Sequence, residues 1–227
     1  KKARELGMTR DELDEYAYQS YQLANLHKDD HTSRMVSIYL PGANDPTLTY
    51  DEGSARALSL AAIKKLSPLP GCEIVTAAHA CKYGDAAACV ALASADALST
   101  HGLRPLARIL AIESWSEDTP DNFIIASNSA IAHALPRARV SLGDVDIFVI
   151  NETFASSPIY FMKKSGVPRK KVNSWGGAIA FGHPFGATGV ALLVMALTML
   201  EKEQKRLAVV AICAAGGESS VCVIERM

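Results

Sequence analysis

Three short segments of this sequence hold residue types that suit chemistry at a carbonyl group. Asn151 follows an apolar run, His183 lies in a tract rich in glycine and alanine, and Cys213 precedes several small residues and glycines. An amide, an imidazole and a thiol together suggest nucleophilic or proton-transfer chemistry. Asn151 and His183 would donate hydrogen bonds to a developing oxyanion, and Cys213 would act as a base. Because ligands of α/β sheets bind at strand ends, we expect the three segments to converge.

Each of these residues also has a purely structural interpretation. Asn151 is a common turn residue after a strand, and Cys213 at the end of the apolar run VVAI is by default a small buried hydrophobe. For His183 the functional interpretation is stronger, because a stiff tract of small residues would hold the ring in place as a catalytic base. No phosphate-binding glycine motif is present, and no metal site is expected, because the histidines outside that tract show no ligand spacing.

Length and composition narrow the class of protein. The chain has 227 residues, of which 49% are hydrophobic and 21% charged, as in ordinary globular proteins of one or two domains. A net charge of −1 gives no reason to expect nucleic acid or an anionic membrane as partner. The apolar run Val190–Leu200 is too short for a membrane span and predicts a core helix. Five cysteines without zinc-like spacing favour a reducing compartment (mitochondrial, peroxisomal or cytoplasmic) over a disulfide framework.

The first hundred residues predict a partly helical region. Thr9 and Glu12 form a capping box before a helix with one apolar face, and a second helix is expected over Gly53–Leu66. Ile74–Ala80 is expected to be a strand that enters a loop. The continuous apolar run Ala86–Ser94 predicts a buried strand.

The rest of the chain alternates between strand and helix patterns. Helices are expected over Ala95–Gly102, Asn122–Leu135, Phe154–Lys164 and Val190–Gln204, and strands over Leu106–Glu113, Asp146–Ile150, Leu207–Cys213 and Ser220–Glu225. Pro136 is expected to break the second of these helices. The last two strands are joined by six residues, which is too short for a parallel crossover, so they should form an antiparallel hairpin. The order β-α-β-α-β-α-β-β predicts a layered α/β domain with a mixed sheet.

Four segments together resemble the signatures of the thiolase superfamily. GGAIAFGHPFGATG, residues 176–189, is similar to the long thiolase signature G-G-A-I-A-x-G-H-P-x-G-x-[ST]-G. NETFA, residues 151–155, resembles the N-E-A-F motif, and CAAGGES, residues 213–219, resembles the C-x-G-G-G segment. HACKYGDAAACVALAS, residues 79–94, resembles the stretch that ends the coenzyme A loop region. The resemblance extends from about residue 9 to the end of the chain.

The resemblance implies the thiolase-type layered α/β fold and its domain organisation. Residues 1–83 would form a loop domain that binds coenzyme A, residues 84–104 the last segment of the N-terminal domain, and residues 105–227 the C-terminal domain. The implied activity is acyl transfer, either thiolytic cleavage of 3-ketoacyl-CoA or Claisen condensation of acyl-CoA thioesters. Coenzyme A or acyl-CoA would be a substrate, with no permanently bound cofactor. The implied partners are the remaining N-terminal half, on this or another chain, and a second copy in a homodimer.

The resemblance also implies roles for individual residues. Asn151 would hold a water that forms an oxyanion hole with His183, and His183 would also activate an acyl-accepting cysteine in the part of the family that precedes this sequence. Cys213 would exchange a proton with the α-carbon of the second acyl-CoA, and the Ala215 amide would donate to a second oxyanion hole. The pantetheine arm of coenzyme A would be lined by Ala78, Ala80, Cys81, Thr153 and Phe154.

Several positions depart from the family pattern. Ala215 and Ser219 stand where glycines are usual, so a positive φ at Ala215 would be strained. Trp175 replaces a small or amide residue and is expected to narrow the pocket, and His79 and Cys81 replace Asn and Ser. These departures leave open an alternative, a catalytically impaired thiolase-like protein that binds acyl-CoA or a protein partner. A ketosynthase relative is a third alternative, which the N-E-x-F and G-H-P motifs disfavour.

Overall fold

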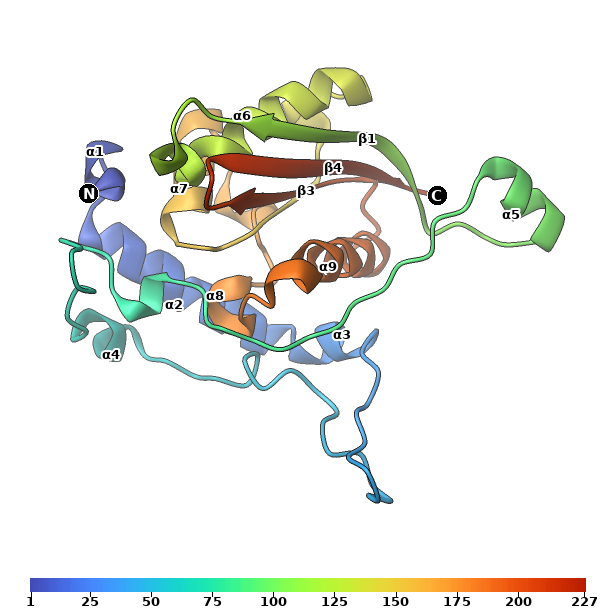
Figure 1. Cartoon of the computed structure of the whole chain (residues 1–227), viewed down its shortest axis with the longest axis horizontal. Helices are drawn as coiled ribbons and strands as arrows, with labels where there is room; N and C mark the ends of the chain where they lie inside the picture. The colour runs from blue at the N-terminus through green and yellow to red at the C-terminus, as the bar shows by residue number, and fades with distance from the viewer. The chain divides into compact units, whose positions relative to one another are not determined.

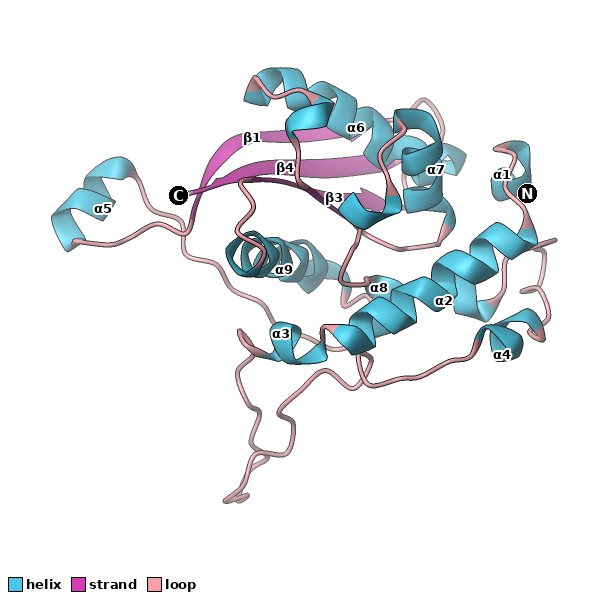
Figure 2. Ribbon diagram, turned by 180° about the vertical axis from the view of Figure 1, so that it is seen from behind, coloured by secondary structure: helices cyan, strands magenta, loops and turns pink.

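The computed structural model describes all 227 residues and divides them into two compact units. Unit 1 comprises Lys1–Asp85 and Ile150–Pro184, and unit 2 comprises Ala86–Val149 and Phe185–Met227. Figure 1 and Figure 2 show the elements of each unit. We describe each unit by itself.

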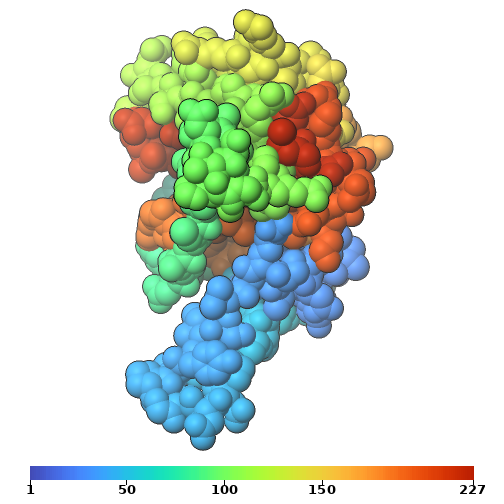
Figure 3. Space-filling model, turned by 90° about the vertical axis from the view of Figure 1, so that its right-hand side faces the viewer, coloured from blue at the N-terminus to red at the C-terminus, as the bar shows by residue number.

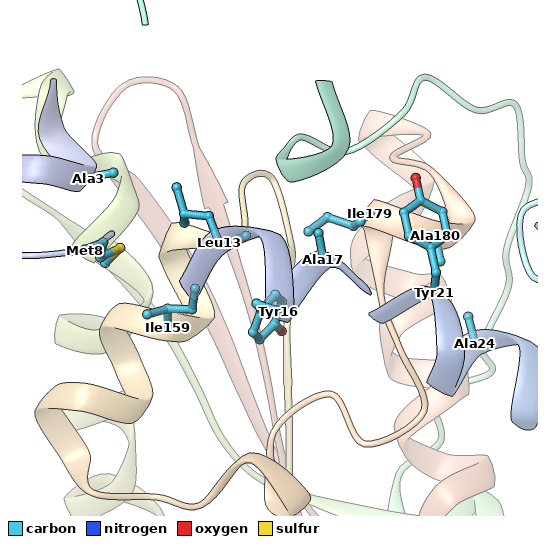
Figure 4. Packing of buried hydrophobic residues seen from close by; sticks show 11 residues of the cluster. Ala3, Met8, Leu13, Tyr16, Ala17, Tyr21, Ala24, Ile159, Ile179 and Ala180 are labelled. Atoms are coloured by element: carbon cyan, nitrogen blue, oxygen red, sulfur yellow. The ribbon is translucent and has the colours of Figure 1, made fainter. Parts of the chain in front are cut away.

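Unit 1 is built around one long helix. Its helices are α1 (Lys2–Glu5), α2 (Arg10–Leu26), α3 (Lys28–Thr32), α4 (Leu60–Lys64), α7 (Ser156–Ser165) and α8 (Ala178–Phe181). The predicted capping box of α2 is confirmed, because Glu12 N donates to Thr9 Oγ1 and Thr9 N donates to Glu12 Oε2. The apolar face of α2 is buried as predicted. Figure 4 shows its side chains packed against Ile159 of α7 and Ile179 of α8.

Unit 2 is a sheet with helices packed on it. Its elements are α5 (Ala95–His101), β1 (Ala107–Ser116), α6 (Phe123–Ala138), α9 (Thr188–Lys202), β3 (Leu207–Ala214) and β4 (Glu218–Arg226), with most of β2 (Ile147–Ile150). The strand order is β1-β4-β3-β2, and β4 runs antiparallel to both β1 and β3. This confirms the predicted final hairpin, although its turn is only Ala215–Gly217. Helix α6 packs across β1, β4 and β3, and α9 packs against β3.

Helix α9 confirms the core helix predicted from the apolar run. The stretch Phe185–Lys202 has the length and hydropathy of a membrane span, but a core helix of a soluble protein passes the same test. Here α9 buries Leu192, Met195 and Met199. The burial of these side chains beside β3 favours the core assignment.

Three predicted elements are wrong in extent or type. The Gly53–Leu66 helix is reduced to α4, because Asp51 Oδ1 accepts hydrogen bonds from Gly53 N and Ser54 N in a turn and Ser59 then caps the short helix. Ile74–Ala80 is not a strand. Its end forms a short 3₁₀ turn, Ala77–His79, capped by Thr76. Ala86–Ser94 is extended and largely exposed rather than a buried strand.

One further difference concerns α6. Pro136 does not break α6, which continues to Ala138 and ends at Arg139 in the left-handed conformation. Residues 33–50 form an arm that projects from unit 1, as the light-blue atoms in Figure 3 show. The large apolar side chains exposed on this arm are Met35, Val36, Ile38, Tyr39, Leu40, Leu48 and Tyr50.

Candidate functional site

Asn151 lies at the end of β2 and is almost completely buried. Its Nδ2 donates a hydrogen bond of 3.0 Å to Thr153 Oγ1. Its Oδ1 is buried and has no hydrogen-bond partner among the protein atoms. A buried polar atom of this kind is ordinarily satisfied by protein or by water, so Asn151 presents a free acceptor suited to a bound water or ligand.

The residue before His183 is Gly182, at a position whose backbone conformation favours glycine. Gly182 has φ +97, a backbone conformation that residues with a Cβ rarely adopt. The backbone N–H of His183 donates a 2.7 Å hydrogen bond to Lys82 O, in a parallel bridge between Tyr83 and His183. Burial of the imidazole lowers the pKa of His183 below its ordinary value. The ring is therefore suited to stay neutral near pH 7.

The segment His79–Tyr83 lies between the Asn151 loop and the His183 loop, and we call it the 79–83 strap. On one side, Cys81 N donates to Thr153 O at 3.0 Å and Ala155 N donates to His79 O at 2.8 Å. On the other side, the strap accepts the His183 amide through Lys82 O. The structure thereby brings most of the predicted coenzyme A residues together with Asn151 and His183, namely Ala80, Cys81, Thr153 and Phe154. Ala78 is buried in the turn just before the strap.

A buried charge cluster anchors the strap to α2. His79 Nε2 lies 2.6 Å from Asp14 Oδ1, and Thr76 N donates to His79 Nδ1 at 3.0 Å. Because Nδ1 accepts this backbone hydrogen bond, the proton of the neutral ring is on Nε2 and points at Asp14. Arg10 Nε donates to both Asp14 oxygens at 2.9 Å. Burial lowers the pKa of His79, although the Asp14 carboxylate opposes the shift.

Cys213 and Ala215 lie in unit 2, and the structure describes them separately from Asn151 and His183. The convergence of all three segments therefore stays a prediction. Cys213 is buried and pairs directly with Ser219 across the β3–β4 hairpin. Ser219 Oγ donates to Ile212 O at 3.0 Å and lies 3.2 Å from Ser127 Oγ on α6. The Ser219 hydroxyl, at a position where glycine is usual, thus donates to β3 and lies within hydrogen-bonding distance of α6.

Ala215 is exposed in the hairpin turn, and its φ is not positive. The strain that a positive φ would have caused at this alanine is therefore absent. The left-handed residue of the turn is Gly217, with φ +86, where a Cβ would lie 2.8 Å from Thr119 O. The glycine required by this turn is at position 217, two residues after the expected one.

Trp175 is buried within unit 1, and its expected effect on the pocket stays a prediction. Its ring stacks on His27 with centroids 4.8 Å apart, and the edge of His31 meets it at 5.5 Å. His31 Nε2 lies 3.0 Å from Trp175 O, and burial lowers the pKa of His31 to about 4. The ring of His31 also meets Phe181, two residues before His183, with centroids 4.4 Å apart. Trp175 and the two histidines therefore form an aromatic cluster that packs against the segment leading to His183.

Glu152 is the buried polar residue of this region to which sequence reasoning gave no role. Its side chain is fully buried and accepts hydrogen bonds from α2, from Asn173 and from the start of α8. The sequence contains one signal for it, since a charged residue lies two positions after the strand Ile147–Ile150, inside the NETFA motif. Its partners lie more than twenty residues away and could not be read from that motif.

A mixed sheet with helices packed on it defines an α/β protein. The sequence model described as the C-terminal domain of thiolase matches residues 103–226, and that described as the N-terminal domain of thiolase matches residues 1–96. The chain belongs to the thiolase family.

Individual relatives agree with this assignment. A probable 3-ketoacyl-CoA thiolase of Caenorhabditis elegans is 32% identical over 96% of this chain and 53% of its own length. An acetyl-CoA acetyltransferase of Synechocystis is 34% identical over 100% of this chain and 58% of its own length. The chain therefore spans little more than half the length of these curated relatives.

Solved structures confirm the thiolase-type α/β fold. The acetyl-CoA acetyltransferase of Bacillus anthracis superposes with a TM-score of 0.91 at 28% identity, over 99% of this chain and 59% of that one. A thiolase of Ascaris suum in complex with coenzyme A superposes with a TM-score of 0.87 at 28% identity, over 100% of this chain and 58% of that one.

Proposed function

We propose that this chain is the coenzyme A-binding and C-terminal part of a thiolase that transfers acyl groups between coenzyme A thioesters. The reaction is thiolytic cleavage of 3-ketoacyl-CoA or, in reverse, Claisen condensation of two acyl-CoA molecules. The observation that carries the proposal is the His183 signature, held by backbone hydrogen bonds against the 79–83 strap. The names of the similar proteins, 3-ketoacyl-CoA thiolase and acetyl-CoA acetyltransferase, support both directions.

In this proposal the enolate of a thioester is the species that needs stabilisation. Asn151, through a water on its free Oδ1, and the neutral ring of His183 donate toward the enolate oxygen. Cys213 takes a proton from the α-carbon of the second acyl-CoA and returns it in the reverse direction. The exposed amide of Ala215 serves a second oxyanion hole. The nucleophilic cysteine that accepts the acyl group is supplied from outside the 227 residues.

We propose that coenzyme A binds along the strap. Its pantetheine arm is lined by Ala78, Ala80, Cys81, Thr153 and Phe154, most of which have small side chains that allow close approach. The loop-domain assignment of residues 1–83 accompanies this proposal, with residues 84–104 and 105–227 assigned to the N-terminal and C-terminal domains. A homodimer is the proposed assembly.

The decisive experiment uses the complete protein that contains these residues. It should cleave acetoacetyl-CoA in the presence of coenzyme A, and His183→Ala should lower kcat by at least about 100-fold, as expected when an oxyanion-hole donor is lost. His101→Ala is the matched control, because His101 is exposed at the end of α5. A complete protein that neither turns over nor forms an acyl-enzyme would exclude the enzymatic proposal, and a fully active His183→Ala would exclude the role of the histidine.

The buried Ser219 beside Cys213 favours one second candidate, a thiolase-like protein that binds acyl-CoA without turnover. The Ser219 hydroxyl occupies space beside Cys213 that a glycine would leave open. In this case coenzyme A should bind with an affinity that survives Cys213→Ala. A titration of coenzyme A into the inactive protein distinguishes this candidate from a protein that has lost the ligand as well.

A further inference from the structure

The fully buried carboxylate of Glu152 joins three segments of unit 1. Its Oε1 accepts from Tyr16 Oη at 2.7 Å and from Asn173 Nδ2 at 3.0 Å. Its Oε2 accepts from Ser20 Oγ at 2.7 Å and from the backbone N–H of Ile179 at 3.1 Å. The carboxylate therefore holds α2, the Asn173 turn and the first residues of α8 at one point.

These partners are neutral donors, which is an unusual environment for a fully buried carboxylate. A buried carboxylate is costly unless its lone pairs are satisfied, and an apolar side chain would pack the same space without that cost. The guanidinium of Arg169 lies 4.5 Å from the centroid of the Tyr16 ring. A positive charge therefore lies beside Tyr16, which is one of the hydrogen-bond donors to Glu152. Burial, together with the negative charge of Glu152, raises the pKa of Tyr16, which keeps its hydroxyl a donor.

The glycines of the histidine signature fit this carboxylate. A Cβ on Gly177 would overlap the carboxylate group of Glu152. The glycine therefore lets the backbone at the start of α8 come close enough for Ile179 N to donate to Oε2. From Ile179 the chain runs through the short helix α8 and Gly182 directly to His183.

Asn173 extends the same network to the strand that carries Asn151. Its Oδ1 accepts from Ile150 N and its Nδ2 donates to Ile150 O, both at 2.8 Å. Asn173 has φ +46, a left-handed conformation that asparagine tolerates better than most residues. The residue just before Asn151 is thus held by the side chain that also donates to Glu152.

We propose that Glu152 is a positioning residue, whose buried carboxylate sets the placement of Asn151 and of the His183 loop for enolate stabilisation. The inference rests on the proposed thiolase function. Glu152 would act indirectly, by fixing the backbone of the two segments that carry Asn151 and His183. Glu152 itself is buried under them and does not touch substrate in this assignment.

Glu152→Gln is the sharpest variant, because it keeps the volume and removes the charge. The amide of Gln has only one acceptor oxygen, while Asn173 Nδ2 and Ile179 N are both donors. The backbone N–H of Ile179 can only donate, and Asn173 could turn its oxygen toward the new amide only by breaking its hydrogen bonds to Ile150. One of the two must lose its hydrogen bond. We expect kcat to fall at least about tenfold with KM changed less than about threefold, because preorganisation and not ground-state binding is lost. Glu15→Gln, at an exposed carboxylate of α2, is the matched control.

Two readouts in the complete protein do not depend on turnover. Amide hydrogen exchange in the peptide covering residues 176–183 should accelerate at least about tenfold in Glu152→Gln, because the Ile179 anchor is weakened. The titration midpoint of the His183 ring, followed by NMR, should rise toward its ordinary value as the loop loosens and water enters. Glu15→Gln should leave both measurements at the wild-type values.

The outcomes separate this inference from the proposed function. If exchange accelerates but the His183 titration and kcat stay at wild-type values, Glu152 is only a structural residue and the positioning role is wrong. Wild-type exchange, titration and kcat together would also overturn it. If the wild-type protein shows no thiolase turnover, the proposed function fails, and the His183 titration alone decides whether Glu152 positions the loop.

Discussion

At the scale of single residues, unit 1 favours the uncharged form of two histidines, the buried His79 and the half-buried His31. His79 donates to Asp14 and accepts from a backbone amide, and His31 lies against Trp175 and Phe181. Burial lowers the pKa of both rings, to about 4 for His31. An unfolded chain binds a proton at each ring near pH 6.5, while the folded chain resists it. Their contribution to stability is therefore complete above about pH 6.5 and is lost as the pH falls.

The free energy of unfolding should accordingly decrease between about pH 6.5 and pH 4, with His31 contributing at most about 3 kcal/mol. His31→Gln keeps a donor for Trp175 O but cannot be protonated. Urea unfolding at a series of pH values should show a weaker decrease for His31→Gln than for the wild type, because His79 and His183 still contribute. An identical pH dependence of both proteins would contradict the burial of His31.

At the scale of elements, local signals and tertiary contacts contribute differently. The caps of α2 and α5 follow from the side chains of Thr9 and Ser94 and the left-handed Gly102, all of which lie within a few residues of the helix ends. Ala86–Ser94 fails as a strand because an apolar run forms a strand only when a neighbouring strand accepts its hydrogen bonds. Composition can predict the tendency of this run but cannot supply the partner.

The contact between α2 and the 176–180 turn gives a prediction at this scale. Gly176 has φ +83, and a Cβ there would lie 2.7 Å from Ser20 O and 2.9 Å from Ala24 Cβ. Gly176→Ala should therefore destabilise the protein by more than about 2 kcal/mol, through backbone strain and separation of the turn from α2. Gly143→Ala is the control, because its φ is not in the left-handed region and its Cβ would meet only a distant side-chain atom. Equal unfolding midpoints for the two variants would contradict this packing.

At the scale of the whole molecule, the chain consists of two units connected three times, near residues 85, 149 and 184. The first of these connections leads into the exposed stretch Ala86–Ser94, where Leu92 is 75% exposed. In our domain proposal this stretch belongs to the N-terminal domain, which the family's N-terminal sequence model also covers as far as residue 96. Its apolar composition suits a strand whose partner strand lies outside these 227 residues.

Brief elastase digestion of the 227-residue chain should cleave first within residues 86–106 or in the exposed 33–50 arm. In the complete protein, cleavage within 86–94 should be suppressed, because the strand then has its partner, while cleavage in the arm is the internal comparison. Fragment masses identify the sites. Protection of 86–94 in the isolated chain, or equal cleavage in both proteins, would show that the stretch gains no partner from the rest of the molecule.

The sequence by itself determined the family, the capping box of α2 and the final hairpin, and it singled out Asn151, His183 and Cys213 as candidates. These depend on residue type and short spacing, which act locally. Only the tertiary structure decided that the 79–83 strap joins the Asn151 and His183 loops, that Trp175 packs against two histidines, and that Glu152 connects α2 to the start of α8. Contacts between residues far apart in the sequence depend on how the chain folds back on itself, and no local pattern encodes them.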